Sequence, residues 1–181
     1  MDNLTLLGTV GGVVLVCGAA YPDRPGIKPI RSVKDWLFAI GGVCTLLYSV
    51  IGYFQGGSVF FVFLQALVNL SSIFMMADLD ERIGTPIVAL AGLGLIAWSF
   101  RLDAGMQTVF FVLGLAGIAV GYCSKGGTSH RELALLLGSA LIALFSYLQA
   151  SWVFFWLNLF FAFFSALQFH LLTRPRSRRG F

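Results

Sequence analysis

Apolar positions along this chain form long stretches, separated by short segments rich in charge, glycine or proline. A helix needs about 20 mostly apolar residues to cross the hydrocarbon core of a bilayer. Stretches of this kind lie at 4–21, 35–54, 58–77, 84–100, 104–122, 131–149 and 152–172. The pattern predicts an all-α membrane protein with seven transmembrane helices as two parallel three-helix repeats joined by a linker helix, for reasons given below.

Two parts of the chain repeat each other in sequence. Residues 51–76 match residues 145–170 without gaps, and the identical pairs are Tyr53/Tyr147, Gln55/Gln149, Val59/Val153, Phe60/Phe154, Phe61/Phe155 and Ser71/Ser165. A second match joins Leu7, Gly8, Gly11, Val14 and Cys17 to Leu113, Gly114, Gly117, Val120 and Cys123. Two matches in the same order indicate a duplicated three-helix unit. Chance similarity is the alternative, because membrane segments draw on few residue types.

The helix predicted at 84–100 lies between the two units. An odd number of linking helices gives both units the same direction across the membrane, so we expect parallel repeats. The predicted divisions are a first repeat at 1–78, a linker helix at 79–103, a second repeat at 104–173 and a basic cytoplasmic tail at 174–181. We interpret the matched glycines as close helix packing.

Polar residues inside the predicted spans are few and share helix faces. Gln65, Asn69 and Ser72 follow an i, i+4, i+7 spacing, and Asn158 lies on the same face as Ser165. No Asp, Glu, Lys or Arg falls in the middle of a span. Ion-coupled carriers usually keep an ionisable group there, so the sequence favours facilitated passage.

Three of the polar side chains are predicted at one depth. At ~1.5 Å per residue, Gln65 and Asn158 lie roughly 10–12 Å below the outer surface, with Tyr48 at a similar level. We expect Tyr48, Gln65, Asn69 and Asn158 to bind a small polar solute. The alternative is that these groups only hydrogen-bond neighbouring helices. The phenylalanines at 60–63 and 154–164 are expected to face lipid by default.

Composition supports a membrane protein. Hydrophobic residues make up 58% of the chain, charged residues 11%, and the mean hydropathy is +0.87, whereas soluble domains are about a quarter charged. The chain starts Met1-Asp2-Asn3 without a basic residue, unlike a cleavable signal peptide, so we expect the first helix to be retained.

Positive charge sets the expected orientation. With seven spans, Arg101 is the one cation on its side, and the other Lys and Arg residues all fall on the opposite side. Cytoplasmic loops carry such an excess, so the N-terminus is expected outside and the C-terminus in the cytoplasm, in a plasma or inner membrane. The net charge of +4 therefore reflects topology and not nucleic-acid binding, and the tail is expected to lie on anionic lipid.

Two parallel triple-helix units joined by one helix resemble the SWEET (MtN3/saliva) and PQ-loop transporters and the nicotinamide-riboside transporters of the PnuC type. Gly8 and Pro22 resemble the family's first-helix Gly and Pro, and Leu47-Tyr48 and Leu64-Gln65 resemble PnuC features. The family's Pro-Gln dipeptide is absent, since Pro22 precedes Asp23.

In sugar-carrying members of this family, an aromatic residue on the second helix and an Asn on the third line the pocket. The resemblance implies these roles for Tyr48 and Asn158, with Gln65 in place of the first unit's Asn.

Other chemistry has little support in the sequence. His130 and His170 have no His or Cys nearby at ligand spacing, and Cys17, Cys44 and Cys123 are isolated, so we expect no metal site and no cofactor. No catalytic set is recognisable, so an enzyme is not expected.

The function hypothesis is facilitative transport of a small polar solute (sugar, nucleoside or vitamin-like) by alternating access between the units. The alternative is a non-transport seven-helix receptor or accessory subunit. The expected partners are the lipid bilayer and the solute, and assembly into a homo-oligomer is left open.

Overall fold

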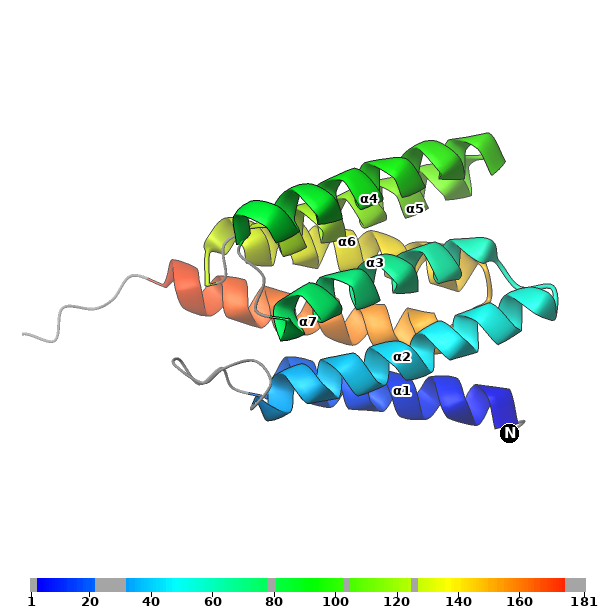
Figure 1. The fold of residues 1–181 in the computed structure, drawn as a ribbon, viewed down its shortest axis with the longest axis horizontal. Coiled ribbons are helices and arrows are strands. Elements are labelled where there is room, and N and C mark those ends of the chain that lie inside the picture. The colour runs from blue at the N-terminus through cyan, green and yellow to red at the C-terminus, as the bar shows by residue number, and fades with distance from the viewer. Residues whose placement is uncertain (1–2, 22–31, 78–80, 103–104, 125–126, 175–181) are drawn as a thin grey trace, which may run out of the picture.

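The computed structural model describes residues 3–21, 32–77, 81–102, 105–124 and 127–174, which form seven α-helices (Figure 1). The helices are α1 (Asn3–Ala20), α2 (Val33–Phe54), α3 (Val59–Met76), α4 (Glu81–Leu102), α5 (Met106–Cys123), α6 (Ser129–Leu148) and α7 (Trp152–Thr173). All of these except α3 are long and apolar enough to cross a bilayer, and the apolar stretch described on α3 is Val59–Phe74. The chain is therefore an all-helical protein with the features of a multi-pass membrane protein.

The helices form one bundle in which their axes run roughly side by side (Figure 1). Along the chain, α1 packs on α2, α2 on α3, α5 on α6, and α6 on α7. Two further contacts close the bundle, because α1 packs on α7 and α3 packs on α5. α4 lies against α3 and α5 at one side. The three helices α1–α3, which we call the first triplet, thus meet α5–α7, the second triplet, at both edges.

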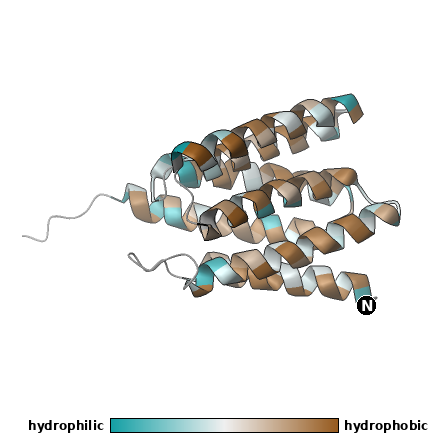
Figure 2. Cartoon of the chain, in the orientation of Figure 1, coloured by the Kyte–Doolittle hydropathy of each residue, from teal (hydrophilic) through white to brown (hydrophobic). Residues whose placement is uncertain are grey.

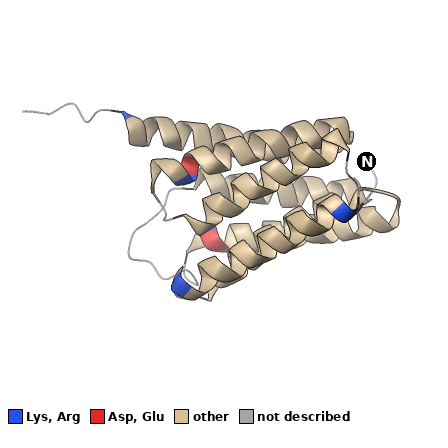
Figure 3. Cartoon of the chain, turned by 90° about the horizontal axis from the view of Figure 1, so that it is seen from above, with Lys and Arg blue, Asp and Glu red and all other residues tan. Residues whose placement is uncertain are grey.

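The helices consist mostly of hydrophobic residues (Figure 2), and many of the large ones are exposed, as expected of a lipid-facing bundle. Large side chains such as Leu90 and Phe163 are exposed, at 70% and 62%. The charged residues that the structure describes lie toward the ends of the bundle, mostly at one end (Figure 3). An apolar patch of this extent in water would be an aggregation site, so its natural environment is a bilayer.

Glycine lets paired helices approach closely in both triplets. A Cβ on Gly41 would lie 2.8 Å from the Leu15 nitrogen and 2.9 Å from the Gly11 oxygen. A Cβ on Gly138 would lie 2.7 Å from the Ile118 nitrogen and 2.8 Å from the Gly114 oxygen. The predicted packing role is confirmed for Gly8, Gly11, Gly114 and Gly117, each of which faces a neighbouring helix at a distance that excludes a side chain.

The hairpins α2–α3 and α6–α7 end their first helix in the same way. The amide of Gly57 donates to the Gly52 carbonyl at 2.9 Å, and the amide of Ser151 donates to the Ser146 carbonyl at 2.9 Å. Such bonds satisfy carbonyls at a helix C-terminus and need a left-handed residue just before the donor. Gly56 provides it with φ +91°, whereas the second hairpin uses Ala150 with φ +52°.

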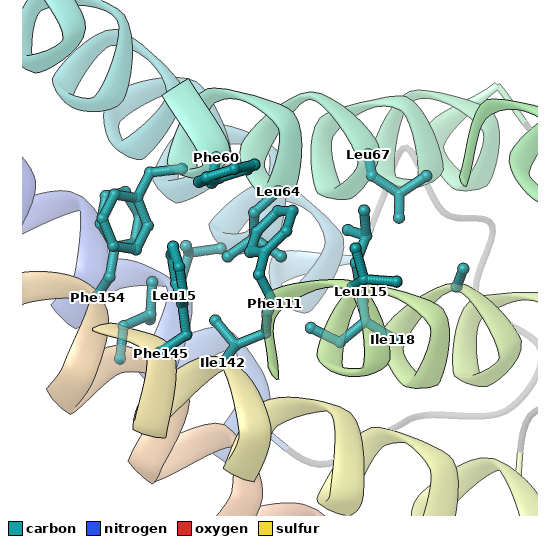
Figure 4. Packing of buried hydrophobic residues seen from close by; sticks show 14 of the residues in the cluster. Leu15, Phe60, Leu64, Leu67, Phe111, Leu115, Ile118, Ile142, Phe145 and Phe154 are labelled. Carbon is teal, nitrogen blue, oxygen red and sulfur yellow. The ribbon is translucent and has the colours of Figure 1, made fainter. Parts of the chain in front are cut away.

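Aromatic rings fill the centre between the triplets (Figure 4). Phe60, Phe111 and Phe145, from α3, α5 and α6, contact one another with ring centroids 4.9–5.6 Å apart. Phe61 and Phe154 stack face to face at 4.4 Å with an angle of 7°. The expectation that these segments face lipid by default is therefore wrong for Phe60, Phe61 and Phe154, which are buried, although Phe163 is exposed.

Candidate functional site

A cavity of about 90 Å³ lies between the two triplets. Every helix except α4 contributes to its wall. Most of the wall is apolar, and its polar or charged side chains are Gln65, Tyr122, Arg131, Ser139, Asn158 and Ser165. At about 10–15 Å³ per water-sized probe, the cavity has room for a handful of water molecules. It is thus a mostly apolar cavity with a few polar groups, and Arg131 lines it where α6 begins.

Gln65 is held in place by one half of its amide. Its Oε1 accepts a hydrogen bond of 2.8 Å from the Thr45 hydroxyl on α2. Its Nε2 donates to no group among the described residues, yet no fully enclosed side-chain N or O in that part of the chain lacks a partner. Nε2 therefore reaches open space, and the cavity that Gln65 lines is that space. Gln65 offers a hydrogen-bond donor to it.

Asn158 uses its amide in the opposite way. Its Nδ2 donates to the Phe154 carbonyl, one turn earlier on α7, at 2.8 Å. By the same reasoning as for Gln65, its Oδ1 has no partner in the described residues and is open to the cavity. The two amides thus present one donor and one acceptor to the same space.

Two serines behave differently from the other serines of the helices. Ser49, Ser72 and Ser146 each donate to a carbonyl in the preceding turn, at 2.7–3.0 Å, which is the usual way to satisfy a hydroxyl in an apolar helix. Ser139 and Ser165 make no such bond within the described chain, although both are buried. Both line the cavity, so their hydroxyls are open to it.

One ion pair lies where α6 begins. The Arg131 guanidinium, which lines the cavity, donates from Nη1 to Glu132 Oε1 at 2.8 Å. The Glu132 side chain is 8% exposed, so a buried carboxylate compensates the cation. Sequence analysis found no charged residue in the middle of a span, and this pair, in the first turn of α6, agrees with it. Arg131, which lines the cavity, is therefore neutralised by a carboxylate that lies beside the wall and is not part of it.

The structure brings together two of the four residues predicted to bind solute. Gln65 and Asn158 line one cavity, whereas Tyr48 lines a second hollow. Asn69 lines neither, because its Nδ2 donates to the Gly42 carbonyl on α2 at 3.0 Å and to the Gln65 carbonyl at 2.8 Å. Asn69 thus joins α2 to α3, as the alternative of interhelical hydrogen bonding anticipated.

The second hollow, which we call the vestibule, has a volume of about 400 Å³ and lies at the hairpin end of the bundle. Aromatic side chains of both triplets line it, including Tyr48, Phe61, Trp152 and Phe154. Tyr48 packs on Phe154 with ring centroids 5.5 Å apart. Phe61 and Phe154 precede Gln65 and Asn158 by one helical turn. The stacked pair therefore lies between the vestibule and the cavity.

Sequence reasoning missed Tyr122, Arg131, Ser139 and Ser165 as lining residues. The shared face of Asn158 and Ser165 was a usable signal for Ser165. For Ser139 no signal exists in the sequence of α6 alone, because its role depends on which residues face it.

Comparison with known proteins gives no relative: no protein-family model, curated protein or solved structure matches this chain. The part of the chain that the structure describes also contains no group of three His, Cys, Asp or Glu side chains that could hold a metal ion. The fold and the cavity define a class, a multi-helix membrane protein with a small cavity between its two triplets that a few polar side chains line.

Proposed function

We propose that this protein is a facilitative transporter for a small, uncharged polar solute, such as a sugar, a nucleoside or a vitamin-like molecule. The observation that carries the proposal is the cavity, where Gln65, Ser139, Asn158 and Ser165 converge with unpaired hydrogen-bonding groups. Leaving such groups open in a membrane interior costs free energy unless a ligand or water satisfies them. Interhelical hydrogen bonding explains Asn69 and the Oε1 of Gln65. It does not explain Gln65 Nε2, Asn158 Oδ1 or the hydroxyls of Ser139 and Ser165.

The packing also supports a duplication of the triplets. Gly11, Leu15 and Gly41 contact one another as Gly114, Ile118 and Gly138 do, through the same backbone atoms. In this alignment Gly11 is the equivalent of Gly114. The register differs by about one helical turn from the Gly8/Gly114 match of the sequence. The reciprocal contacts of α1 with α7 and α5 with α3 fit two parallel repeats, with α4 as the linker.

The cavity lies where a duplication would put a transport site. The glycine contacts align α1 with α5 and α2 with α6, and α3 is aligned with α7 so that Gln65 meets Asn158. In this alignment ten lining residues fall into five equivalent pairs. These pairs are Leu15/Ile118, Phe38/Leu135, Leu64/Leu157, Gln65/Asn158 and Val68/Phe161. Equivalent residues meet around the axis that relates the repeats, and parallel-repeat transporters bind solute at the repeat interface.

Alternating access follows from the two hollows. Phe61 of the first triplet and Phe154 of the second close the path from the vestibule to the cavity by stacking. Rocking of one triplet against the other would separate these rings and open the cavity toward the hairpin end. The cavity is smaller than the roughly 300 Å³ of ordinary ligand pockets, so loading a solute requires the triplets to part.

The proposed orientation places the hairpins outside and the C-terminus in the cytoplasm, following the excess of cations at the other end. Single cysteines at Gly57 and Ser151, in a variant without native cysteines, should react with an impermeant maleimide added outside intact cells. A cysteine at Gly127 should react only after permeabilisation. Labelling of all three positions from one side would overturn the seven-span arrangement.

Flux in proteoliposomes tests the function itself. We expect saturable counterflow of at least one of D-glucose, uridine or pyridoxine, the representatives of the three solute classes. Flux should fall more than tenfold in Asn158→Leu, because a similar volume without polar atoms removes the acceptor. Ser72→Ala is the control, since the Ser72 hydroxyl bonds the Val68 carbonyl. Absence of flux for all three classes from folded protein would contradict the proposal as stated.

The vestibule favours the second candidate, a receptor that binds a ligand at the hairpin end. Its volume of about 400 Å³ and its aromatic walls suit a small ligand. Ligand binding that Trp152→Ala abolishes and Asn158→Leu leaves intact, without flux, would favour this reading over transport.

A further inference from the structure

The cavity wall is not symmetric between the triplets. Beyond the five equivalent pairs, its remaining residues are Tyr122, Arg131, Ser139 and Ser165, and all four belong to the second triplet. For two of them, the equivalent residue of the first triplet does not line the cavity. Gly42 corresponds to Ser139. Ser72 corresponds to Ser165 in the register that pairs Gln65 with Asn158, one residue away from the Ser71/Ser165 match of the sequence.

Polar groups of the first triplet bond one another. Asn69 covers Gly42 so closely that a Cβ there would lie 3.0 Å from Asn69 Oδ1. The Thr45 hydroxyl bonds Gln65, and the Ser72 hydroxyl bonds the Val68 carbonyl at 3.0 Å. We call the bonds of Asn69 and Thr45 across α2 and α3 the clasp. On this side of the cavity, only Gln65 Nε2 is left to interact with a solute.

The second triplet lacks the clasp. Ala162 stands at the position equivalent to Asn69, and Ile142 stands at the position equivalent to Thr45. Neither side chain can hydrogen-bond, so nothing on α6 or α7 satisfies the Ser139 hydroxyl or Asn158 Oδ1. The polar groups that the first triplet keeps for its own packing are open to the cavity in the second.

We propose that Ser139, Asn158 and Ser165 of the second triplet determine solute specificity, whereas the first triplet supplies a rigid frame. This inference rests on the proposed transport function. Two hydroxyls and one amide oxygen can accept from hydroxyl or N–H groups of a solute, and the hydroxyls can also donate. Since Glu132 compensates Arg131, the surface is suited to an uncharged solute that carries several donors and acceptors on one edge.

Chemical modification tests the asymmetry without a known solute. In a variant with Cys17, Cys44 and Cys123 replaced by alanine, we would introduce Ser139→Cys, Ser165→Cys or Ser72→Cys. The probe is 2-aminoethyl methanethiosulfonate, which reacts with water-accessible thiols. We expect both second-triplet cysteines to react at least tenfold faster than Ser72→Cys. Equal rates at Ser72→Cys and Ser165→Cys would overturn the inference.

Substrate analogues then test specificity. For whichever of D-glucose, uridine or pyridoxine is transported, Ser139→Ala and Ser165→Ala should each raise KM about tenfold, because each removes one hydrogen bond. A deoxy analogue lacking the bonded hydroxyl should show a much smaller change between wild type and variant. Ser72→Ala should leave both KM values unchanged.

The two proposals fail in different ways. Flux that responds equally to Ser72→Ala and Ser165→Ala would overturn the specificity inference and leave transport standing. Selective modification of Ser139→Cys and Ser165→Cys without flux of any of the three solutes would refute transport, and the specificity inference would fall with it.

Discussion

The two triplets of this protein use the same helix packing for different purposes. Gly41 and Gly138 sit at equivalent close contacts, with a backbone nitrogen and a backbone oxygen of the neighbouring helix under 3 Å from an added Cβ. The polar residues around these contacts differ. In the first triplet Asn69 and Thr45 hold α2 to α3. In the second, Ala162 and Ile142 offer no hydrogen-bonding group to the Ser139 hydroxyl or to Asn158 Oδ1. If the proposed transport function holds, interhelical bonding and solute binding draw on the same few polar positions, and one triplet serves stability while the other serves recognition.

The largest expected effect comes from filling the shared glycine contact. Gly138→Ala and Gly41→Ala each force a Cβ against backbone atoms, which cannot move as a side-chain tip can, so each should cost about 1–3 kcal/mol. Thermal unfolding in detergent measures the loss. Gly12→Ala, where the added Cβ meets nothing within 4 Å, is the control. If one of these two variants kept its thermal stability and the other unfolded, the two glycine contacts would not be equivalent.

Introducing the clasp into the second triplet should give α6 and α7 the interhelical hydrogen bond that joins α2 to α3. Ala162→Asn would place an amide where it can donate to the Ser139 carbonyl on α6. We expect flux to fall more than tenfold, because the new side chain covers the lining hydroxyl, while the folded fraction in size-exclusion chromatography is unchanged. Phe163→Asn, on the exposed face of the same helix, is the control for adding an amide. Normal flux in Ala162→Asn would show that the two sides do not differ for the reason given.

Removing the clasp from the first triplet should lower the stability of the protein more than it lowers transport. Asn69→Leu and Thr45→Val remove buried interhelical hydrogen bonds, which contribute ~0.6 kcal/mol each on average in membranes. The unfolding midpoint should fall by a few degrees for each variant, and flux per folded molecule should change less than twofold. Ser71→Ala, which removes a bond within α3 only, is the matched control. A tenfold loss of flux per folded molecule would place Asn69 in the binding site after all.

The smallest effect concerns the hairpins. Ala150 adopts the left-handed conformation that Gly56 adopts in the other hairpin, and this conformation disfavours residues with a Cβ. Ala150→Gly should therefore raise the stability of the folded protein by up to about 1 kcal/mol, as judged from thermal unfolding. Gly56→Ala should lower it by a similar amount. Destabilisation by Ala150→Gly would indicate that the Ala150 methyl group makes contacts that outweigh the strain.

Hydrophobic patterning was sufficient to predict all the helices, because a span must be long and apolar. Their starts were placed too late where charges occur in a first turn, as with Lys34-Asp35 and Arg131-Glu132. The capping residues give the true starts: Ser32 accepts from the Asp35 amide, and Thr128 accepts from the Arg131 amide. Charged side chains at a helix end reach the interface and do not end the span.

The register that relates the helices of one triplet to those of the other could not be predicted from the sequence. Glycines recur nearly every turn on α1 and α5, so several registers align some of them. Matching Gly8 to Gly114 gives five identical pairs and matching Gly11 to Gly114 gives three, yet the contacts with the partner helix favour the second register. The site was predicted in part for the same reason. Gln65 and Asn158 stand out as amides in apolar segments, but so does Asn69. Whether an amide bonds a neighbour or faces a cavity depends on the residue opposite, here Gly42 or Ser139.

The stack of Phe61 on Phe154 has a consequence for the permeability of the membrane to ions. A protein with a wet centre and a wet mouth risks becoming a leak for protons and other ions. Apolar constrictions prevent this by expelling water, which breaks any continuous hydrogen-bonded column. Two rings in contact at 4.4 Å leave no room for water between them. In the proposed transporter, the pair that parts for a solute would therefore also insulate the bilayer while it is closed.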